Sequence, residues 1–209
     1  MSLLIAFSGG CHSGKSTTMT TVAGLLQSKG YEVEVFKENM HKHLADTTIE
    51  ELRANPDKYY TVENRVISDR LDAEWDYLTD GKDRIVLIDR AITDNLFYLT
   101  NYINISQLRP DMLKSYTNLL QRIIGHAKAT MPLTFLVEFK PLPQKCDDFS
   151  YRPKNIDDLK QFEYTMIHAY NLAFKSVIDK VPTVYMDLNK PETVIDLVKR
   201  ITKFYDGNK

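Results

Sequence analysis

The residues that could do chemistry first gather near the amino terminus, in the stretch FSGGCHSGKST at residues 7–17. Within it, the spacing Gly9-x-x-x-x-Gly14-Lys15-Ser16 is the pattern of a loop that surrounds phosphate groups. Glycines let the backbone curl so that successive N–H groups point at phosphate oxygens, and the start of a helix adds positive potential. We therefore expect the whole loop to bind the phosphates of a nucleotide, through Gly9, Gly10, Cys11, His12, Ser13, Gly14, Lys15, Ser16 and Thr17.

Two side chains of this loop have predicted roles of their own. The Lys15 ammonium can reach the β- and γ-phosphates, and the Ser16 hydroxyl can ligate Mg²⁺. Cys11 and His12 stand at variable positions of the pattern, and we interpret both as fillers, with contact between His12 and a phosphate as the alternative. ATP and Mg²⁺ are accordingly the expected nucleotide and metal.

A second chemical feature is the pair Asp89–Arg90. A nucleotide-phosphate site needs a carboxylate for Mg²⁺ or its waters, usually at the end of a neighbouring strand. Asp89 directly follows the apolar run 85–88, and Arg90 supplies a cation that can meet a phosphoryl group. Glu138 and Asp187, at or near the ends of later predicted strands, are the alternatives. We expect Asp89 to hold the metal and Arg90 to act on the phosphoryl group.

The elements that must position these residues alternate along the chain. Short apolar segments predict five strands, at residues 3–7, 33–36, 85–88, 133–139 and 182–186. Helical spacing predicts helices at 16–28, over much of 44–80, after Arg90 with a break near Pro110, at 156–178 and at 191–204. Strands that alternate with helices form a parallel sheet covered on both faces. We therefore expect a three-layer α/β/α fold with a five-stranded parallel sheet.

The segment KPLPQKCDDFSYRPK, between the fourth and fifth predicted strands, is rich in proline, aspartate and basic residues. We expect it to belong to a small lid at about residues 140–160. Arg152 would then close over the triphosphate and stabilise charge on the moving phosphoryl group. A solvated basic loop is the alternative interpretation.

Length and composition limit the class of protein. The 209 residues are 43% apolar with a formal net charge of −1, which fits one domain over residues 1–209. Near-zero charge argues against a main task of holding nucleic acid, because phosphate neutralisation usually needs a surplus of Lys and Arg, but a local basic patch stays open. The two cysteines imply no disulfide framework. Without a signal-peptide pattern or an apolar run of about 20 residues, we expect a cytoplasmic protein with no membrane partner.

The stretch IDRAITDNLFYL, residues 88–99, resembles the Asp-Arg signature of P-loop nucleoside and nucleoside-monophosphate kinases, especially thymidylate-kinase-like enzymes. In those enzymes an aromatic residue follows nine positions after the aspartate, which is Tyr98 here. The order of motifs is most similar to the AAA-type kinase domain of NadR-like ribosylnicotinamide kinases, which is also found in many phage proteins. The resemblance implies a P-loop NTPase fold, a Glu after the second strand at Glu38, and a late lid arginine at Arg152.

The phosphoryl acceptor is left open by the residues. A hydroxyl acceptor must lose a proton, and Glu38 would serve as its general base. A monophosphate acceptor is already an anion and needs cationic clamps, for which Arg65, Arg70 and Arg90 are candidates. Tyr98 could stack on a base.

These features predict an ATP- and Mg²⁺-dependent phosphotransferase that acts on a nucleoside or a (deoxy)nucleoside monophosphate. The supply of arginines slightly favours the monophosphate as the acceptor. The alternatives are a kinase that acts on a modified base in DNA, which should show a basic groove beside the active site, and a nucleotide-dependent regulatory ATPase. The oligomeric state stays open, with a homodimer as one alternative.

Overall fold

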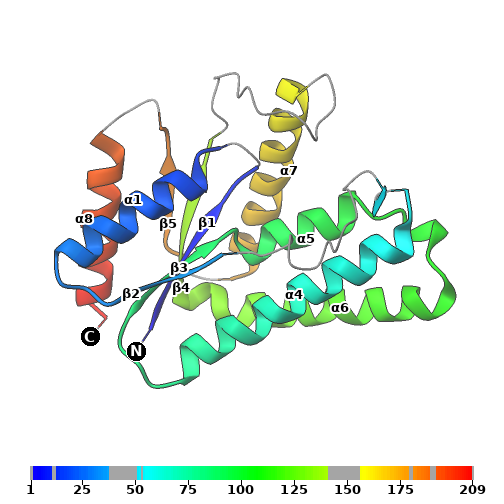
Figure 1. Cartoon of the computed structure of the whole chain (residues 1–209), viewed down its shortest axis with the longest axis horizontal. Coiled ribbons are helices and arrows are strands. Elements are labelled where there is room, and N and C mark those ends of the chain that lie inside the picture. The colour runs from blue at the N-terminus through cyan, green and yellow to red at the C-terminus, as the bar shows by residue number, and fades with distance from the viewer. Residues whose placement is uncertain are drawn as a thin grey trace.

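The protein folds around one parallel sheet, seen in a computed structural model that describes residues 2–10, 13–37, 51–52, 54–140, 156–178, 181–188 and 192–208. The sheet has five strands in the order β2-β3-β1-β4-β5, all parallel (Figure 1). Their bounds are β1 (Leu3–Ser8), β2 (Val33–Phe36), β3 (Ile85–Asp89), β4 (Thr134–Phe139) and β5 (Thr183–Met186). The carboxyl ends of parallel strands meet at one edge, so the residues that follow β1, β3 and β4 lie near one another.

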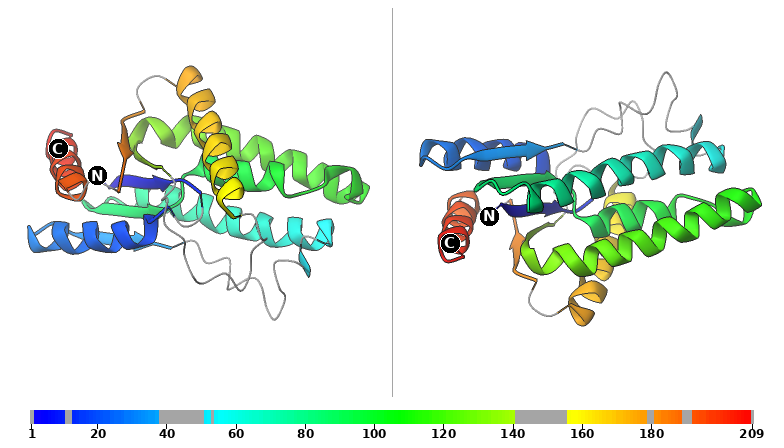
Figure 2. Two further views of the ribbon diagram at one scale, coloured as in Figure 1. Left: turned by 90° about the horizontal axis from the view of Figure 1, so that it is seen from above. Right: turned by 90° about the horizontal axis from the view of Figure 1, so that it is seen from below.

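Helices cover both faces of the sheet (Figures 1 and 2). Their bounds are α1 (Lys15–Ser28), α4 (Pro56–Thr79), α5 (Ile92–Asn101), α6 (Pro110–Thr130), α7 (Ile156–Val177) and α8 (Glu192–Asp206), with short 3₁₀ turns η1 (Ile105–Gln107) and η2 (Met131–Leu133). Helices α1 and α8 pack together on one face, and α4, α5, α6 and α7 lie on the other. The described chain thus has the predicted three layers.

The core explains why the central strands are continuous apolar runs. Ile5, Phe7 and Leu87 of β1 and β3 pack toward α1 and α8, while Leu4 and Val86, which alternate with them, face α4. A strand buried on both faces needs apolar side chains at every position, which is the pattern that predicted them. The edge strands β2 and β5 are partly exposed and correspondingly more polar.

The predicted elements match the described ones within a few residues. Asn55 begins α4 because its side chain accepts the Lys58 N–H at 3.0 Å, and Pro56 fills the first helical position. Pro110 begins α6, at the predicted break. Most of the predicted lid, from residue 141 to 155, lies outside the described residues, and its last part, 156–160, is the start of α7. Of the helices described, none combines the length and apolar character needed to cross a membrane.

Candidate functional site

The glycine loop connects β1 to α1 at the carboxyl edge of the sheet. Gly9 has φ 149° and Gly14 has φ 83°, both in the region that side chains rarely adopt. A Cβ on Gly9 would lie 3.1 Å from the carbonyl oxygen of Phe139 at the end of β4. Gly14 is also the N-cap of α1, so the loop leads directly into the positive end of a fourteen-residue helix.

The Lys15 ammonium lies against this loop and is buried. Its Nζ donates to the carbonyl oxygens of Gly9 and Gly10, both at 2.7 Å, and to Ser13 Oγ at 3.3 Å. Ser13 Oγ also donates to the Gly10 carbonyl at 2.9 Å, which closes the loop on itself. The loop that the sequence pattern predicts to surround phosphate groups therefore holds a positive charge. Ser16 is exposed on the first turn of α1, as is the next residue, Thr17.

Asp89 lies beside the loop because β3 is the direct neighbour of β1, with Asp89 in register with Phe7. The Asp89 carboxylate and the Ser16 hydroxyl are hard oxygen ligands, the kind that Mg²⁺ takes when it binds through few protein groups plus substrate phosphates. No group of three or more His, Cys, Asp or Glu side chains able to hold a metal occurs among the described residues. The donor set therefore fits Mg²⁺.

Glu138, the first alternative to Asp89, is engaged elsewhere. It ends β4 on the other side of β1, and only 1% of its surface is exposed. One carboxylate oxygen bonds His168 Nδ1, and the other lies 3.4 Å from the Lys175 ammonium, both on α7. Asp187 follows β5, a strand farther from β1. The geometry thus favours Asp89 of the three.

The structure brings Arg90 and Tyr98 together. The Arg90 backbone is left-handed, with φ 74°, and its N–H donates to the Phe7 carbonyl at 3.0 Å. Its guanidinium lies over the Tyr98 ring, 4.2 Å from the centroid. Tyr98 in turn stacks on Tyr102, with 5.7 Å between the ring centroids. The arginine is therefore fixed at both its backbone and its side chain, at the edge of the sheet next to the loop.

Asp94 is a site residue that the sequence did not single out. Its carboxylate accepts the Ser8 hydroxyl at 2.6 Å and the Gly9 N–H at 3.0 Å, and it is fully buried. Asn171 of α7 donates to the same Ser8 hydroxyl at 2.9 Å. Burial raises the pKa of Asp94 to about 6, against the opposing influence of Ser8, Lys15 and the Gly9 N–H. The only sequence signal was its position five residues after Asp89 in the quoted motif.

Glu163 is a second residue that sequence reasoning missed. It lies on α7 with 2% of its surface exposed, and a Cβ on Gly10 would come within 3.0 Å of its Oε2. Tyr102 donates its hydroxyl to Glu163 Oε1 at 3.1 Å. Helix α7, which follows the predicted lid in the chain, therefore packs directly on the glycine loop.

Arg70 is placed differently from expectation. The sequence made it a candidate clamp for a substrate phosphate, but its guanidinium is buried and donates to Glu74, Asn95 and the Arg90 carbonyl. Those bonds engage both Nη atoms and Nε within the protein, which corrects the expected contact with substrate. Arg65, the other clamp on α4, is exposed, and its role stays a prediction. Four site residues lie outside the described part of the chain: Cys11, His12, Glu38 and Arg152.

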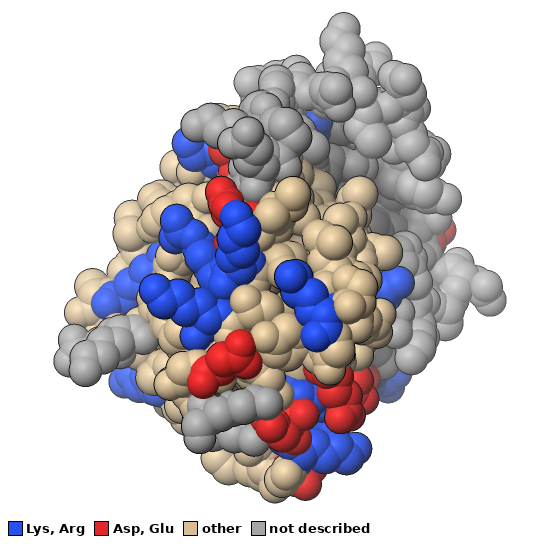
Figure 3. All heavy atoms as spheres, turned by 90° about the vertical axis from the view of Figure 1, so that its left-hand side faces the viewer, with Lys and Arg blue, Asp and Glu red and all other residues tan. Residues whose placement is uncertain are grey.

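The charged surface bears on the alternative of a DNA substrate. Figure 3 shows a gathering of Lys and Arg on the side of the molecule where α8 lies, with acidic side chains below it. Helix α8 carries three exposed basic residues, Lys199, Arg200 and Lys203. These three residues lie on α8, whereas the glycine loop and the Asp89–Arg90 pair follow β1 and β3.

Comparison with known families agrees with this geometry. A family model described as an AAA domain matches residues 4–183, which include the glycine loop, the Asp89–Arg90 pair and the whole of α7. None of the curated proteins matches the chain.

Proposed function

Because this chain belongs to the AAA domain family, whose members are P-loop nucleotide-binding proteins, we propose that it is an ATP-dependent phosphotransferase for a nucleoside or nucleoside monophosphate. The observation that carries this proposal is the placement of Arg90. A protein that only binds nucleotide needs the loop and a carboxylate that holds the metal. Phosphoryl transfer also needs a cation that stabilises the phosphoryl group in the transition state. Arg90, directly after Asp89 and held over Tyr98, supplies that cation beside the loop.

Each residue then has a role in positioning charge. The loop amides and Lys15 bind the β- and γ-phosphates. Ser16 and Asp89 would hold Mg²⁺, which neutralises phosphate charge when it is bound. Arg90 stabilises the charge that spreads over the transferred group, and Arg152 closes from the lid.

The acceptor lies over the carboxyl edge of the sheet, where open α/β sheets bind ligands. Tyr98 is buried there, with the Arg90 guanidinium over its ring and Tyr102 stacked on it, so its ring supports Arg90 and is not open to a base, which corrects the expected stacking. The Arg90 cation is the group that would meet a phosphate of the acceptor. Arg65 and Glu38 are the further candidates for holding the acceptor, as clamp and as general base.

The test is release of ADP measured with a panel of nucleosides and nucleoside monophosphates, in Mg²⁺ and with ATP or GTP. Turnover that depends on one acceptor supports the proposal. Slow turnover that no acceptor changes would contradict it and indicate a regulatory ATPase, and turnover only with DNA would indicate the modified-base kinase.

A variant at Glu38 separates the two acceptor classes. With a hydroxyl acceptor, Glu38→Gln should lower kcat with little change in KM, because the general base is lost. With a monophosphate acceptor, kcat should stay near that of the parent protein, and the role of Glu38 as base would be withdrawn.

A further inference from the structure

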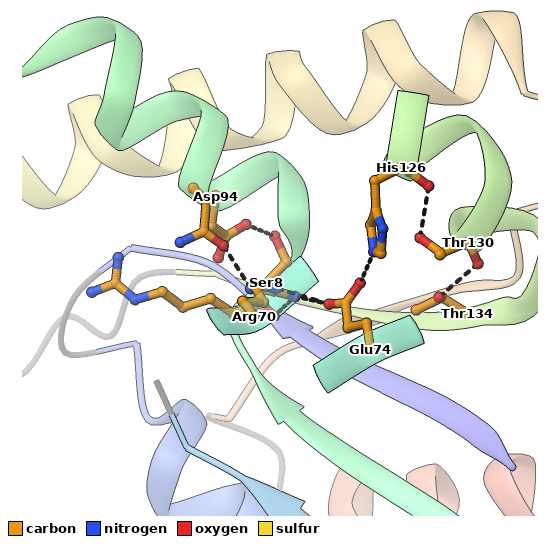
Figure 4. Close-up of polar contacts among 9 residues, drawn as sticks. Ser8, Arg70, Glu74, Asp94, His126, Thr130 and Thr134 are labelled. Atoms are coloured by element: carbon orange, nitrogen blue, oxygen red, sulfur yellow. Dashed lines mark hydrogen bonds and ion pairs between the residues drawn. The ribbon is translucent and has the colours of Figure 1, made fainter. Parts of the chain in front are cut away.

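A hydrogen-bonded series of three side chains, His126, Glu74 and Arg70, leads from helix α6 to the backbone of Arg90, and the last two of them are buried. His126 of α6 bonds Glu74 through Nε2 and Oε2, 2.7 Å apart. The other Glu74 oxygen accepts from Arg70 Nε at 2.8 Å and Nη2 at 2.6 Å, and Arg70 Nη2 also donates to the Arg90 carbonyl at 2.8 Å. Figure 4 shows Arg70, Glu74 and His126 joined in that order by dashed lines, with the Asp94–Ser8 contact next to Arg70.

This arrangement is poorly explained by stability alone. Arg70 is 1% exposed and Glu74 4%, so both charges have lost their water. A buried ion pair is often no more stabilising than apolar residues of the same size. Burial by itself raises the pKa of Glu74, but Arg70 and His126 outweigh it and hold the pKa below its usual value. The carboxylate therefore stays charged and keeps the guanidinium plane fixed.

This series of hydrogen bonds ends at Arg90, whose backbone is strained. Arg90 has a Cβ but a left-handed backbone, with φ 74°, a conformation that costs free energy in any residue other than glycine. That backbone is held from two sides, because its N–H donates to Phe7 and its carbonyl accepts from Arg70. Arg70 Nη1 also donates to Asn95 at 2.7 Å, one residue after the Asp94 that holds the glycine loop. The planar guanidinium reaches both partners at once, which an ammonium cannot.

We propose that Arg70 is a positioning residue that holds Arg90 in its left-handed conformation for phosphoryl transfer, with Glu74 and His126 fixing the Arg70 guanidinium. The expected effect on phosphoryl transfer rests on the proposed function. The claim that Arg70 holds the Arg90 backbone does not. Arg70 itself is buried and touches no substrate.

The experiment compares two variants that separate stability from positioning. Arg70→Met leaves Glu74 buried and charged without its main partner, so Tm should fall by roughly 10 °C. Arg70→Met combined with Glu74→Met removes both charges and should recover most of that loss in Tm. We expect kcat to remain about tenfold or more below the parent protein in both, with KM for ATP changed less than about twofold. Recovery of kcat together with Tm in the double variant would overturn the proposal.

A cycle with Arg90→Ala tests whether Arg70 acts through Arg90. If it does, Arg70→Met should cost less than about threefold in kcat once Arg90 is absent, because the positioned group is gone. An equal loss of kcat in both backgrounds would show that Arg70 acts by another route. Arg122→Met is the matched control, since Arg122 is an exposed arginine that joins α6 to Ser68 of α4, and its kcat should equal that of the parent protein.

A measurement without turnover keeps this proposal distinct from the proposed function. In ¹H–¹⁵N spectra of the 24.2 kDa chain, the Arg90 signals should move in the Arg70→Met/Glu74→Met variant, while the Gly9 amide, held by Asp94, stays in place. Unchanged Arg90 signals would contradict the positioning role. Absence of acceptor-dependent turnover in the parent protein would contradict the proposed function alone.

Discussion

Asp94 holds Gly9: the carboxylate at the start of α5 accepts the N–H of the first glycine of the phosphate loop at 3.0 Å. The same carboxylate accepts the Ser8 hydroxyl at 2.6 Å, at the last residue of β1. Helix α5 directly follows the Asp89–Arg90 pair, so the segment that carries the metal carboxylate also anchors the loop that binds phosphate. Loss of the Asp94 carboxylate should therefore release the Gly9 N–H.

The first prediction concerns pH. Burial raises the pKa of Asp94 to about 6, well above the value of 3.8 for an exposed aspartate. Between these two values the folded protein binds more protons than the unfolded chain, so stability falls as pH rises. The contribution of this raised pKa to the free energy of unfolding is complete below about pH 4 and is lost as the pH rises through about 6.

Asp94→Asn removes this titration. We expect the difference in free energy of unfolding between the parent protein and the variant to decrease by roughly 2 to 3 kcal/mol from pH 4 to pH 7. Urea unfolding at a series of pH values measures it. A difference that stays constant over this range would show that Asp94 titrates normally.

The sequence predicted the elements that depend on local pattern. Apolar runs such as 85–88 identified the central strands, and Gly9, Gly14 and Lys15 identified the phosphate loop, because a loop of that shape restricts which residues can occupy it. Pro110 and the apolar spacing of 16–28 set helix boundaries for equally local reasons.

The sequence could not predict which polar side chains are buried. Nothing in the sequence marks Asp94, Arg70 or Glu163 as buried, and only the packing of α4, α5 and α7 on the sheet takes them out of water. Arg70 was expected to be a substrate clamp because the sequence does not show that its guanidinium is already bonded within the protein. The structure places Glu74 and the Arg90 carbonyl beside it.

The second prediction concerns Lys15. Lys15→Ala removes the ammonium held between the Gly9 and Gly10 carbonyls, and the chain should remain folded by circular dichroism. We expect kcat/KM for ATP to fall by about a hundredfold or more, because the charge at the phosphates is lost. The control is Lys199→Ala, an exposed lysine on α8, which should leave kcat/KM unchanged. Near-normal turnover of Lys15→Ala would remove Lys15 from the site.

The third prediction compares two glycines. A Cβ on Gly10 would come within 3.0 Å of Glu163 Oε2 and 3.1 Å of Glu163 Cβ, so Gly10→Ala must move α7 or the loop. We expect a loss of about 1 to 2 kcal/mol in free energy of unfolding and weaker ATP binding, measured by urea unfolding and calorimetry.

Gly125→Ala is the matched control for that variant. Gly125 lies within α6, and a Cβ there would meet nothing within 4 Å. The added methyl should raise the free energy of unfolding by about 0.5 to 1 kcal/mol, because glycine disfavours a helix interior, and ATP binding should not change. Equal effects of the two substitutions on ATP binding would contradict the contact between Glu163 and the loop.

The fourth prediction separates the backbone of Arg90 from its side chain. Arg90→Ala and Arg90→Gly both remove the guanidinium that lies over Tyr98, so both should transfer phosphoryl groups far more slowly than the parent protein. They differ in backbone cost, because alanine keeps the strain of a left-handed conformation with φ 74° and glycine relieves it. Arg90→Gly should therefore be more stable than Arg90→Ala by about 1 kcal/mol in urea unfolding, even after the greater freedom of glycine in the unfolded chain is counted. If alanine proved as stable as glycine at this position, the strained backbone and the need for Arg70 to hold it would both be refuted.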